Sequence, residues 1–328
     1  MPSRQPTSLP QQPAYRLGTA PFYSPLRYPG GKRKLANFMA LVLRANDLLD
    51  AEYVEVYAGG AGVALSLLFG DYVRRVHIND IDPGVHAFWV SARDHTAELC
   101  QLIRGARIDR GEWERQREIQ GNSNAGVVEL GFSTFYLNRT NRSGIITGGL
   151  IGGRDQASIW KMNARFQKDD LIRRIQRIGR WRSRIAVHRL DGAEFLETVA
   201  PRMVHRSLLY LDPPYYVKGQ EMLYANYYGP EDHARISRLV SKLRRPWVVS
   251  YDDTPEIREL YRGYRAVTYG ISYSANSRYA GREVAFFSEG LVVPPVPDPT
   301  RLTVADVERL SVRMGSRPRL RLGGTLST

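Results

Sequence analysis

The sequence contains one cysteine, Cys100, among 328 residues, and no apolar run approaches the length of a membrane span. A single cysteine excludes an internal disulfide and a cysteine-based metal site, a pattern typical of proteins in a reducing compartment. The nearest candidate for a span, Val63 to Phe69, is far shorter than the roughly 20 residues that a membrane helix needs. We therefore expect a cytoplasmic protein that contacts no membrane and holds no metal.

Acidic residues are also scarce, since 33 Asp and Glu stand against 47 Lys and Arg, which gives a formal net charge of +14. The excess is segregated along the chain. Residues 101–190 carry 18 basic and 8 acidic residues, residues 1–34 carry six basic and no acidic residues, and residues 301–328 carry six against two. A solubility effect would spread the charge evenly, whereas one basic insert and two basic tails favour a nucleic-acid partner.

Strand and helix patterns alternate in two blocks. The first block predicts a strand over 53–57, a glycine turn, a helix over 63–69, a strand over 73–78 and a helix over 83–93. The second block predicts strands over 185–188, 207–211, 247–251, 265–273 and 284–288, with helices over 191–199, 230–243 and 255–261. Such alternation is typical of a doubly wound α/β fold.

Composition divides the chain further. Residues 1–21 are rich in Pro, Gln and Ser, which predicts a disordered basic tail. Residues 22–94 and 185–293 form the alternating unit, and residues 95–184 interrupt it as a basic, mostly helical insert. Residues 294–328 predict a linker, a short amphipathic helix and a basic tail.

The most informative motif is Asp212-Pro-Pro-Tyr215, which directly follows the predicted buried strand over 207–211. The two prolines fix φ and remove two backbone donors, so the turn is stiff and its carbonyls are free to accept. Asp212 and the Pro213 carbonyl can accept from an amino group, while Tyr215 offers a face for stacking. The combination suits the exocyclic amine of a flipped nucleobase. A stiff turn that merely ends a core strand is the alternative interpretation.

A second group of residues predicts a nucleoside site. Glycines over 58–62 let the backbone approach a ligand closely at a helix N-terminus. Asp80 ends the next predicted strand, where such folds place an acid for ribose hydroxyls. Asp191 precedes another predicted helix, where its carboxylate can accept from an adenine amine. For both acids, capping of a following helix is the alternative interpretation.

Six motifs occur in the order found in Dam-type DNA adenine methyltransferases, and residues 22–290 resemble that family. The motifs are Arg27-Tyr-Pro-Gly-Gly-Lys32, Tyr57-Ala-Gly-Gly60, Asn79-Asp-Ile-Asp82, Tyr136-Leu-Asn-Arg139, Asp212-Pro-Pro-Tyr215 and Ser250-Tyr-Asp-Asp-Thr254. The resemblance implies a Rossmann-like methyltransferase with a doubly wound sheet and an inserted, mainly helical target-recognition domain. It also implies S-adenosylmethionine as the cofactor and double-stranded DNA as the substrate, in a prokaryotic nucleoid or as a phage enzyme. A cognate restriction endonuclease is a possible partner, and the oligomeric state stays open.

The resemblance also implies roles by position. The residues implied in cofactor binding are Tyr28 and Lys32 at the methionine part, Tyr57 and Gly59 in the cradle, Asp80 at the ribose, Asp191 at the adenine, and Asp212. The residues implied in holding the target adenine are Asp212, Pro213 and Tyr215. The candidate phosphate contacts in the insert are Arg139, Arg142, Arg154, Lys161 and Arg165.

The chain departs from the family pattern at three places, and alternatives remain. Val56 stands where many relatives have proline, and Ala61 stands where a second glycine is usual. Residues 148–157 lack the Phe-Asn-Val-Pro run of relatives that read GATC, so that specificity is not implied. The same residues would also suit methylation of cytosine N4 or of an adenine in RNA. A relative that kept the fold and binds DNA without catalysis is a further alternative. Cytosine C5 chemistry needs a thiol nucleophile, for which Cys100 lacks the usual preceding proline.

Overall fold

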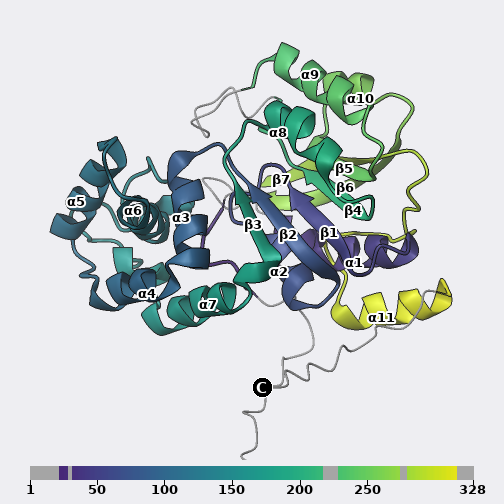
Figure 1. Ribbon diagram of the computed structural model, residues 1–328. Coiled ribbons are helices and arrows are strands. Elements are labelled where there is room, and N and C mark those ends of the chain that lie inside the picture. Colours follow the sequence, from purple (N-terminus) through teal and green to yellow (C-terminus); the bar gives the residue numbers. More distant parts are fainter. Residues whose placement is uncertain (1–21, 29–31, 217–227, 274–278, 316–328) are drawn as a thin grey trace, which may run out of the picture.

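A seven-stranded sheet forms the centre of the computed structural model, which describes residues 22–28, 32–216, 228–273 and 279–315 (Figure 1). The strand order is β3-β2-β1-β4-β5-β7-β6. The strands are β1 (Ala51–Glu55), β2 (Val73–Asn79), β3 (Ile185–His188), β4 (Ser207–Leu211), β5 (Trp247–Asp252), β6 (Arg265–Tyr273) and β7 (Tyr279–Phe287). β7 runs antiparallel to both neighbours, whereas the pairs from β3 to β5 are parallel.

Helices cover both faces of this sheet (Figure 1). Alternation along each strand sends one set of side chains to each face. Val54 and Leu209 belong to a cluster with helices α8 (Gly192–Thr198), α9 (Pro230–Val240) and α10 (Pro255–Leu260). Tyr53 and Leu208 belong to a second cluster, which includes residues of α1 (Ala36–Ala45), α2 (Gly62–Phe69) and α3 (Pro83–Asp94). The prediction of a doubly wound α/β fold is confirmed.

Element bounds agree closely with the sequence patterns. The predicted strands over 185–188, 207–211 and 265–273 appear as β3, β4 and β6 with the same bounds. β7 begins at Tyr279, five residues before the predicted start at 284, because it pairs with the whole of β6. A short helix, α11 (Val304–Arg313), packs on α1 near the end of the described chain.

The insert is helical and packs directly on α3. Its helices are α4 (Thr96–Gly105), α5 (Arg110–Gly121), α6 (Val127–Thr140) and α7 (Lys168–Arg180), with the short 3₁₀ turns η2 (Arg142–Gly144) and η3 (Met162–Arg165). Phe135 of α6 stacks on Phe88 of α3 with ring centroids 5.9 Å apart. Every residue of α6 from Gly131 to Thr140 is buried. The insert therefore shares an apolar core with the α/β unit.

No helix in the described part of the chain is long and apolar enough to cross a membrane. The described residues likewise contain no cluster of three or more His, Cys, Asp or Glu side chains able to hold a metal ion.

Candidate active site

The predicted site residues follow three parallel strands whose carboxyl ends lie next to one another. β1, β2 and β4 are parallel neighbours, so the glycine turn after Glu55, Asp80 after β2 and Asp212 after β4 all lie at their carboxyl ends. The chain leaves β1 for the face covered by α2, while α9 follows β4 along the chain and covers the other face. Ligands of doubly wound sheets bind at such a switch point between neighbouring strands.

Asp212 is held in a buried cluster at these strand ends. The Lys32 Nζ lies 2.8 Å from Asp212 Oδ1 and 2.9 Å from Oδ2. The Ser250 hydroxyl, on β5, donates to Oδ1 at 2.9 Å. The Asp212 side chain is 22% exposed and that of Lys32 is 3% exposed. Lys32 and Ser250 therefore fix the orientation of the Asp212 carboxylate, which is still partly exposed to solvent.

The same cluster contains Tyr215 and a second carboxylate, Glu283 of β7. Tyr215 donates its hydroxyl hydrogen to Glu283 Oε1 at 2.6 Å and accepts from Lys32 Nζ at 2.9 Å. Tyr215 is only 6% exposed, so the free protein does not present the open ring face that the predicted base stacking requires. The Lys32 ammonium contacts Asp212, Tyr215 and Glu283, and its predicted contact with the methionine part of the cofactor stays a prediction.

Burial governs the ionisation of these acids. It raises the pKa of Asp212 above its ordinary value, an effect that Lys32 opposes and Glu283 reinforces. Burial also raises the pKa of Glu55, which lies beneath α2 and accepts from the Ala64 N–H at 2.6 Å, to about 8. Burial therefore favours the protonated form of Glu55.

The glycine turn is closely covered by an aromatic ring. Gly59 has φ +46°, and a Cβ at this position would lie 2.8 Å from the ring of Tyr28. The Gly59 carbonyl accepts from Trp89 Nε1 at 2.9 Å, and its N–H donates to Asp80 at 2.8 Å. Only glycine meets both the conformation and the space. Ala61, also at positive φ (45°), begins α2 without a side-chain cap.

Asp80 connects the turn to β2. Its second oxygen accepts from the Asp82 N–H at 3.0 Å, and burial raises its pKa to about 6. The cap of α3 is supplied by Asp82, which accepts from Gly84 N and Val85 N. The capping interpretation is therefore wrong for Asp80.

Asp191 does cap its helix, through a 2.9 Å bond from the Ala193 N–H. Its other oxygen accepts from the Tyr228 hydroxyl at 2.8 Å, which in turn lies 3.2 Å from the Tyr57 hydroxyl. A Cβ on Gly192 would meet that Tyr57 hydroxyl at 2.1 Å, so this glycine is required for the arrangement. Tyr57, Tyr228 and Asp191 thus form one polar and aromatic wall beside the strand ends.

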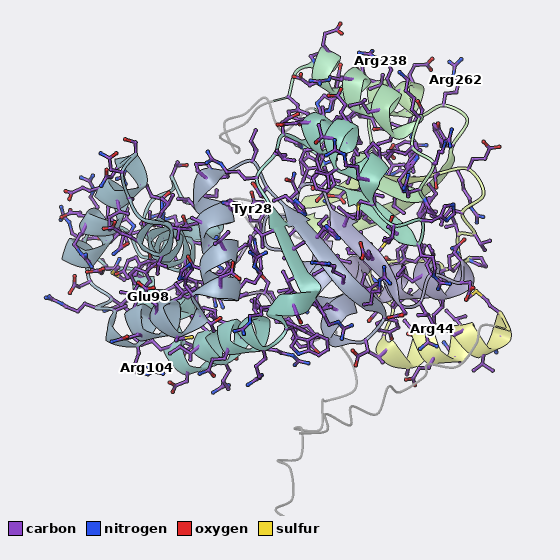
Figure 2. The ribbon with its side chains drawn as sticks, in the orientation of Figure 1. Tyr28, Arg44, Glu98, Arg104, Arg238 and Arg262 are labelled. Atoms are coloured by element: carbon purple, nitrogen blue, oxygen red, sulfur yellow. The ribbon has the colours of Figure 1, made fainter. Side chains whose placement is uncertain are left out.

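The insert is tied to the strand-end site through Asn138. Its side chain accepts from the Arg27 N–H at 2.7 Å and donates to the Arg27 and Gly144 carbonyls at 2.6 and 2.7 Å. The next residue, Tyr28, therefore lies between insert and sheet (Figure 2). Two motifs 111 residues apart meet here, and residues 29–31 between Tyr28 and Lys32 lie outside the described residues.

A comparison with protein-family models matches residues 28–274 to the D12 class N6 adenine-specific DNA methyltransferases. The chain belongs to this family. The match covers most of the chain and all six motifs except the start of the first, so the sequence-based family prediction is confirmed. The cofactor of this methyltransferase is S-adenosylmethionine.

Solved structures give only distant similarities. A proposed RNA methyltransferase from Pyrococcus horikoshii is 10% identical and has a TM-score of 0.38, over 80% of this chain and 86% of that one. The rRNA methyltransferase AviRa from Streptomyces viridochromogenes is 12% identical, with a TM-score of 0.35 over 86% and 89% of the two chains. A type I restriction-modification methyltransferase subunit from Streptococcus thermophilus is 8% identical, with a TM-score of 0.36 over 90% and 54%. Comparison with curated proteins gave no match.

The groups at the strand ends of the methyltransferase suit a nucleoside cofactor. The left-handed backbone at Gly59 and Ala61 leads the chain into the N-terminus of α2, beneath the ring of Tyr28. The carboxylates of Asp80 and Asp191 and the hydroxyls of Tyr57 and Tyr228 supply acceptors and donors around it. These groups suit ribose hydroxyls and an adenine amine, and the roles of the individual cofactor residues stay predictions.

The basic residues predicted to contact phosphates divide into two groups. Arg142, Arg154, Lys161 and Arg165 are exposed on the insert. Arg139 is 7% exposed, and burial together with Arg174 and Arg27 lowers its pKa to about 9. The predicted surface contact is therefore wrong for Arg139, because α6 is buried from Gly131 to Thr140.

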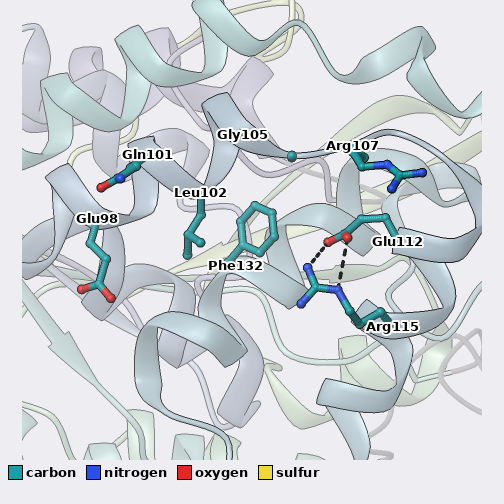
Figure 3. A pocket seen from close by; sticks show the side chains of 9 residues that line it. Glu98, Gln101, Leu102, Gly105, Arg107, Glu112, Arg115 and Phe132 are labelled. Atoms are coloured by element: carbon teal, nitrogen blue, oxygen red, sulfur yellow. Dashed lines mark hydrogen bonds and ion pairs between the residues drawn. The ribbon is translucent and has the colours of Figure 1, made fainter.

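A cavity of about 560 Å³ lies within the insert (Figure 3). Residues of α4, α5 and α6 line it, and the ion pair between Glu112 and Arg115 borders it. None of its lining residues belongs to the Asp212 cluster.

Sequence reasoning did not single out Glu283 or the role of Ser250. Glu283 precedes an apolar run, and the period of two in a strand places it on the same side as Ala285 and Phe287, which are buried. A carboxylate at a core-facing strand position is a signal that the strand pattern alone can provide.

Proposed function

We propose that this methyltransferase transfers a methyl group to the exocyclic N6 amine of an adenine turned out of double-stranded DNA. The observation that supports it most is the state of Asp212, which is partly exposed while Lys32 and Ser250 fix it from the protein side. The Pro213 carbonyl follows on the same stiff turn. Together they offer two acceptors to one amino group.

The side chains act by orientation and charge. When bound, S-adenosylmethionine supplies a methyl group already activated by a positively charged sulfur, so no covalent protein nucleophile is needed. Hydrogen bonds from the amine to Asp212 and Pro213 favour a pyramidal nitrogen with its lone pair free to react. Positive charge that develops on this nitrogen is stabilised by the carboxylate. The nitrogen loses one proton, which Asp212 or water accepts.

The insert is proposed to hold the DNA. Arg154, Lys161 and Arg165 are exposed on the same segment as Trp160, which is 64% exposed, and Ile159, which is 93% exposed. The Arg165 guanidinium lies 5.7 Å from the Trp160 ring centroid. Exposed cations beside an exposed aromatic ring suit phosphates and bases.

The loop that carries these residues is internally braced. The Gln156 side chain donates to the carbonyls of Ile151 and Gly153 at 2.8 and 2.6 Å and accepts from the Met162 N–H at 2.8 Å. Because both ends of the loop are tied to one side chain, its tip projects as a formed surface. Such a surface can meet DNA without ordering a long segment first.

The direct test exposes unmethylated genomic DNA to the protein and labelled S-adenosylmethionine, and then maps modified bases by sequencing. We expect N6-methyladenine at one recurring sequence and no label in an equal amount of RNA. Label in N4-methylcytosine or in RNA would refute the substrate proposal. The Asp212→Ala variant, incubated in parallel, should transfer no label.

A further inference from the structure

Glu283 is a charged residue on an otherwise apolar strand face. Its exposed fraction is 0%, and it lies on the same side of β7 as Ala285 and Phe287. The register of the sheet aligns it with Asp252 of β5 and Tyr269 of β6. A carboxylate in such a place is unfavourable unless protein groups replace the water that it has lost.

The side chains of Tyr215 and Lys32 replace that water. The Tyr215 hydroxyl donates to Glu283 Oε1 at 2.6 Å, and Lys32 Nζ lies 3.3 Å from the same oxygen. Lys32 also contacts both oxygens of Asp212. Glu283 is therefore joined to the Asp-Pro-Pro-Tyr motif directly at Tyr215 and, through one ammonium, at Asp212. It is too deeply buried to touch a substrate itself.

We propose that Glu283 is a positioning residue for methyl transfer, acting through Lys32 and Tyr215 on the orientation and charge of Asp212. This inference rests on the function proposed above. Because Lys32 divides its positive charge between two carboxylates, it does not fully neutralise Asp212. The exposed side of Asp212 then keeps the negative charge that receives the amine and stabilises positive charge developing on it.

The groups around Asp212 make this role visible in a pH profile. The charged or titratable groups that act on Asp212 come from six elements of the described structure. They are Lys32 of the 3₁₀ turn η1 (Lys32–Leu35), Tyr53 and Glu55 of β1, Tyr210 of β4, Tyr215 of the turn, Tyr269 of β6 and Glu283 of β7. Among these groups, the charge of Glu283 raises the pKa of Asp212, whereas the charge of Lys32 lowers it.

The test is the Glu283→Gln variant, which keeps the size and an acceptor for Tyr215 but removes the charge. We expect kcat in single-turnover methylation to fall about 10- to 100-fold, as for loss of one charged hydrogen bond. The cofactor Kd and the DNA KM should stay near wild type. The acid limb of the kcat profile should move to lower pH, because loss of a nearby negative charge lowers the pKa of Asp212.

A matched control is Glu52→Gln, which removes another buried carboxylate from the same sheet. Glu52 is 8% exposed and bonds to His77 and Arg74, away from the Asp212 cluster. Its variant should keep the wild-type rate and pH profile. A Glu283→Gln enzyme with wild-type kcat and an unmoved acid limb would overturn the proposal. If wild type itself fails to methylate DNA, the proposed function fails, which is a separate result.

The Tyr215→Phe variant tests the same link from the other side and serves if Glu283→Gln does not fold. It removes only the hydroxyl that Glu283 holds, and kcat should fall while the cofactor Kd is kept. In the double variant the two losses should combine to less than their product, because they break one connected network. Fully multiplicative losses, or a Tyr215→Phe enzyme as fast as wild type, would contradict the proposal.

Discussion

Replacing Asp212 by Asn is the most informative single change, because it keeps the shape of the side chain and removes its charge. Lys32 Nζ contacts both carboxylate oxygens at 2.8 and 2.9 Å, and Ser250 donates to one of them. An asparagine must place its amide NH₂ toward one of these donors. The carbonyl oxygen then stays with Ser250 or Lys32 and is lost to the substrate amine. Lys32 still has Glu283 at 3.3 Å, so folding should suffer less than chemistry.

The expected size follows from the lost interactions. A hydrogen bond to a charged group contributes about 1.5–3 kcal/mol. Loss of one preorganised charged partner of a transition state costs roughly 10²–10³-fold in kcat. Single-turnover transfer of a tritiated methyl group to DNA measures this, with calorimetry to show that the cofactor still binds. Asp253→Asn, which removes a surface-paired carboxylate two residues beyond Tyr251, is the control. A variant at position 212 that keeps more than about a tenth of the wild-type rate would lose under 1.4 kcal/mol and refute the assigned role.

Three further predictions follow from burial and charge. Between pH 4.5, the ordinary pKa of a glutamate, and about 8, only folded wild type keeps the Glu55 proton, so its free energy of unfolding should fall by about 1.4 kcal/mol per pH unit. The Glu55→Gln variant should not show this fall. Identical slopes for the two proteins in urea titrations from pH 5 to 8 would disprove the prediction. Cofactor affinity should weaken about tenfold per pH unit below the raised pKa of Asp80, about 6, because the neutral acid accepts hydrogen bonds from ribose hydroxyls poorly. Calorimetry at pH 5 and 7.5 measures this, and the Asp80→Asn variant should bind the cofactor weakly at both pH values. A wild-type Kd that is the same at both pH values would contradict the prediction. Lys161→Ala should lower the slope of log K against log salt for DNA binding by about one. The control Arg202→Ala, which lies before β4 at the amino ends of the parallel strands, should leave the slope unchanged. Equal slopes for Lys161→Ala and wild type would remove Lys161 from the interface.

The local sequence pattern was sufficient to predict the strands and turns that carry Gly59, Asp80 and Asp212. These strands are short apolar runs that end in polar residues, and parallel pairing places the carboxyl ends of such strands next to one another. Neighbours in sequence determine these features, so they can be predicted without tertiary contacts. The cap of α3 is ambiguous at this level, because Asp80 and Asp82 both precede Pro83 and only the fold shows that Asp82 supplies it.

Features that depend on long-range contacts could not be predicted in the same way. The position of Glu283 beside Lys32 depends on the register of β7 against β5, which no local pattern fixes. Arg139 has the sequence context of a surface residue because it follows a polar neighbour, yet α6 is buried from Gly131 to Thr140. The predicted domain limits and the recognition role of the insert remain predictions.

The central claim is that the glycine turn and the Asp212 corner open onto one cleft, where donor and amine meet. A crystal structure with S-adenosylhomocysteine tests this most directly. The account predicts the ribose hydroxyls at Asp80 and the sulfur facing the Asp212 carboxylate. A product bound elsewhere, or with its sulfur directed away from Asp212, would contradict it.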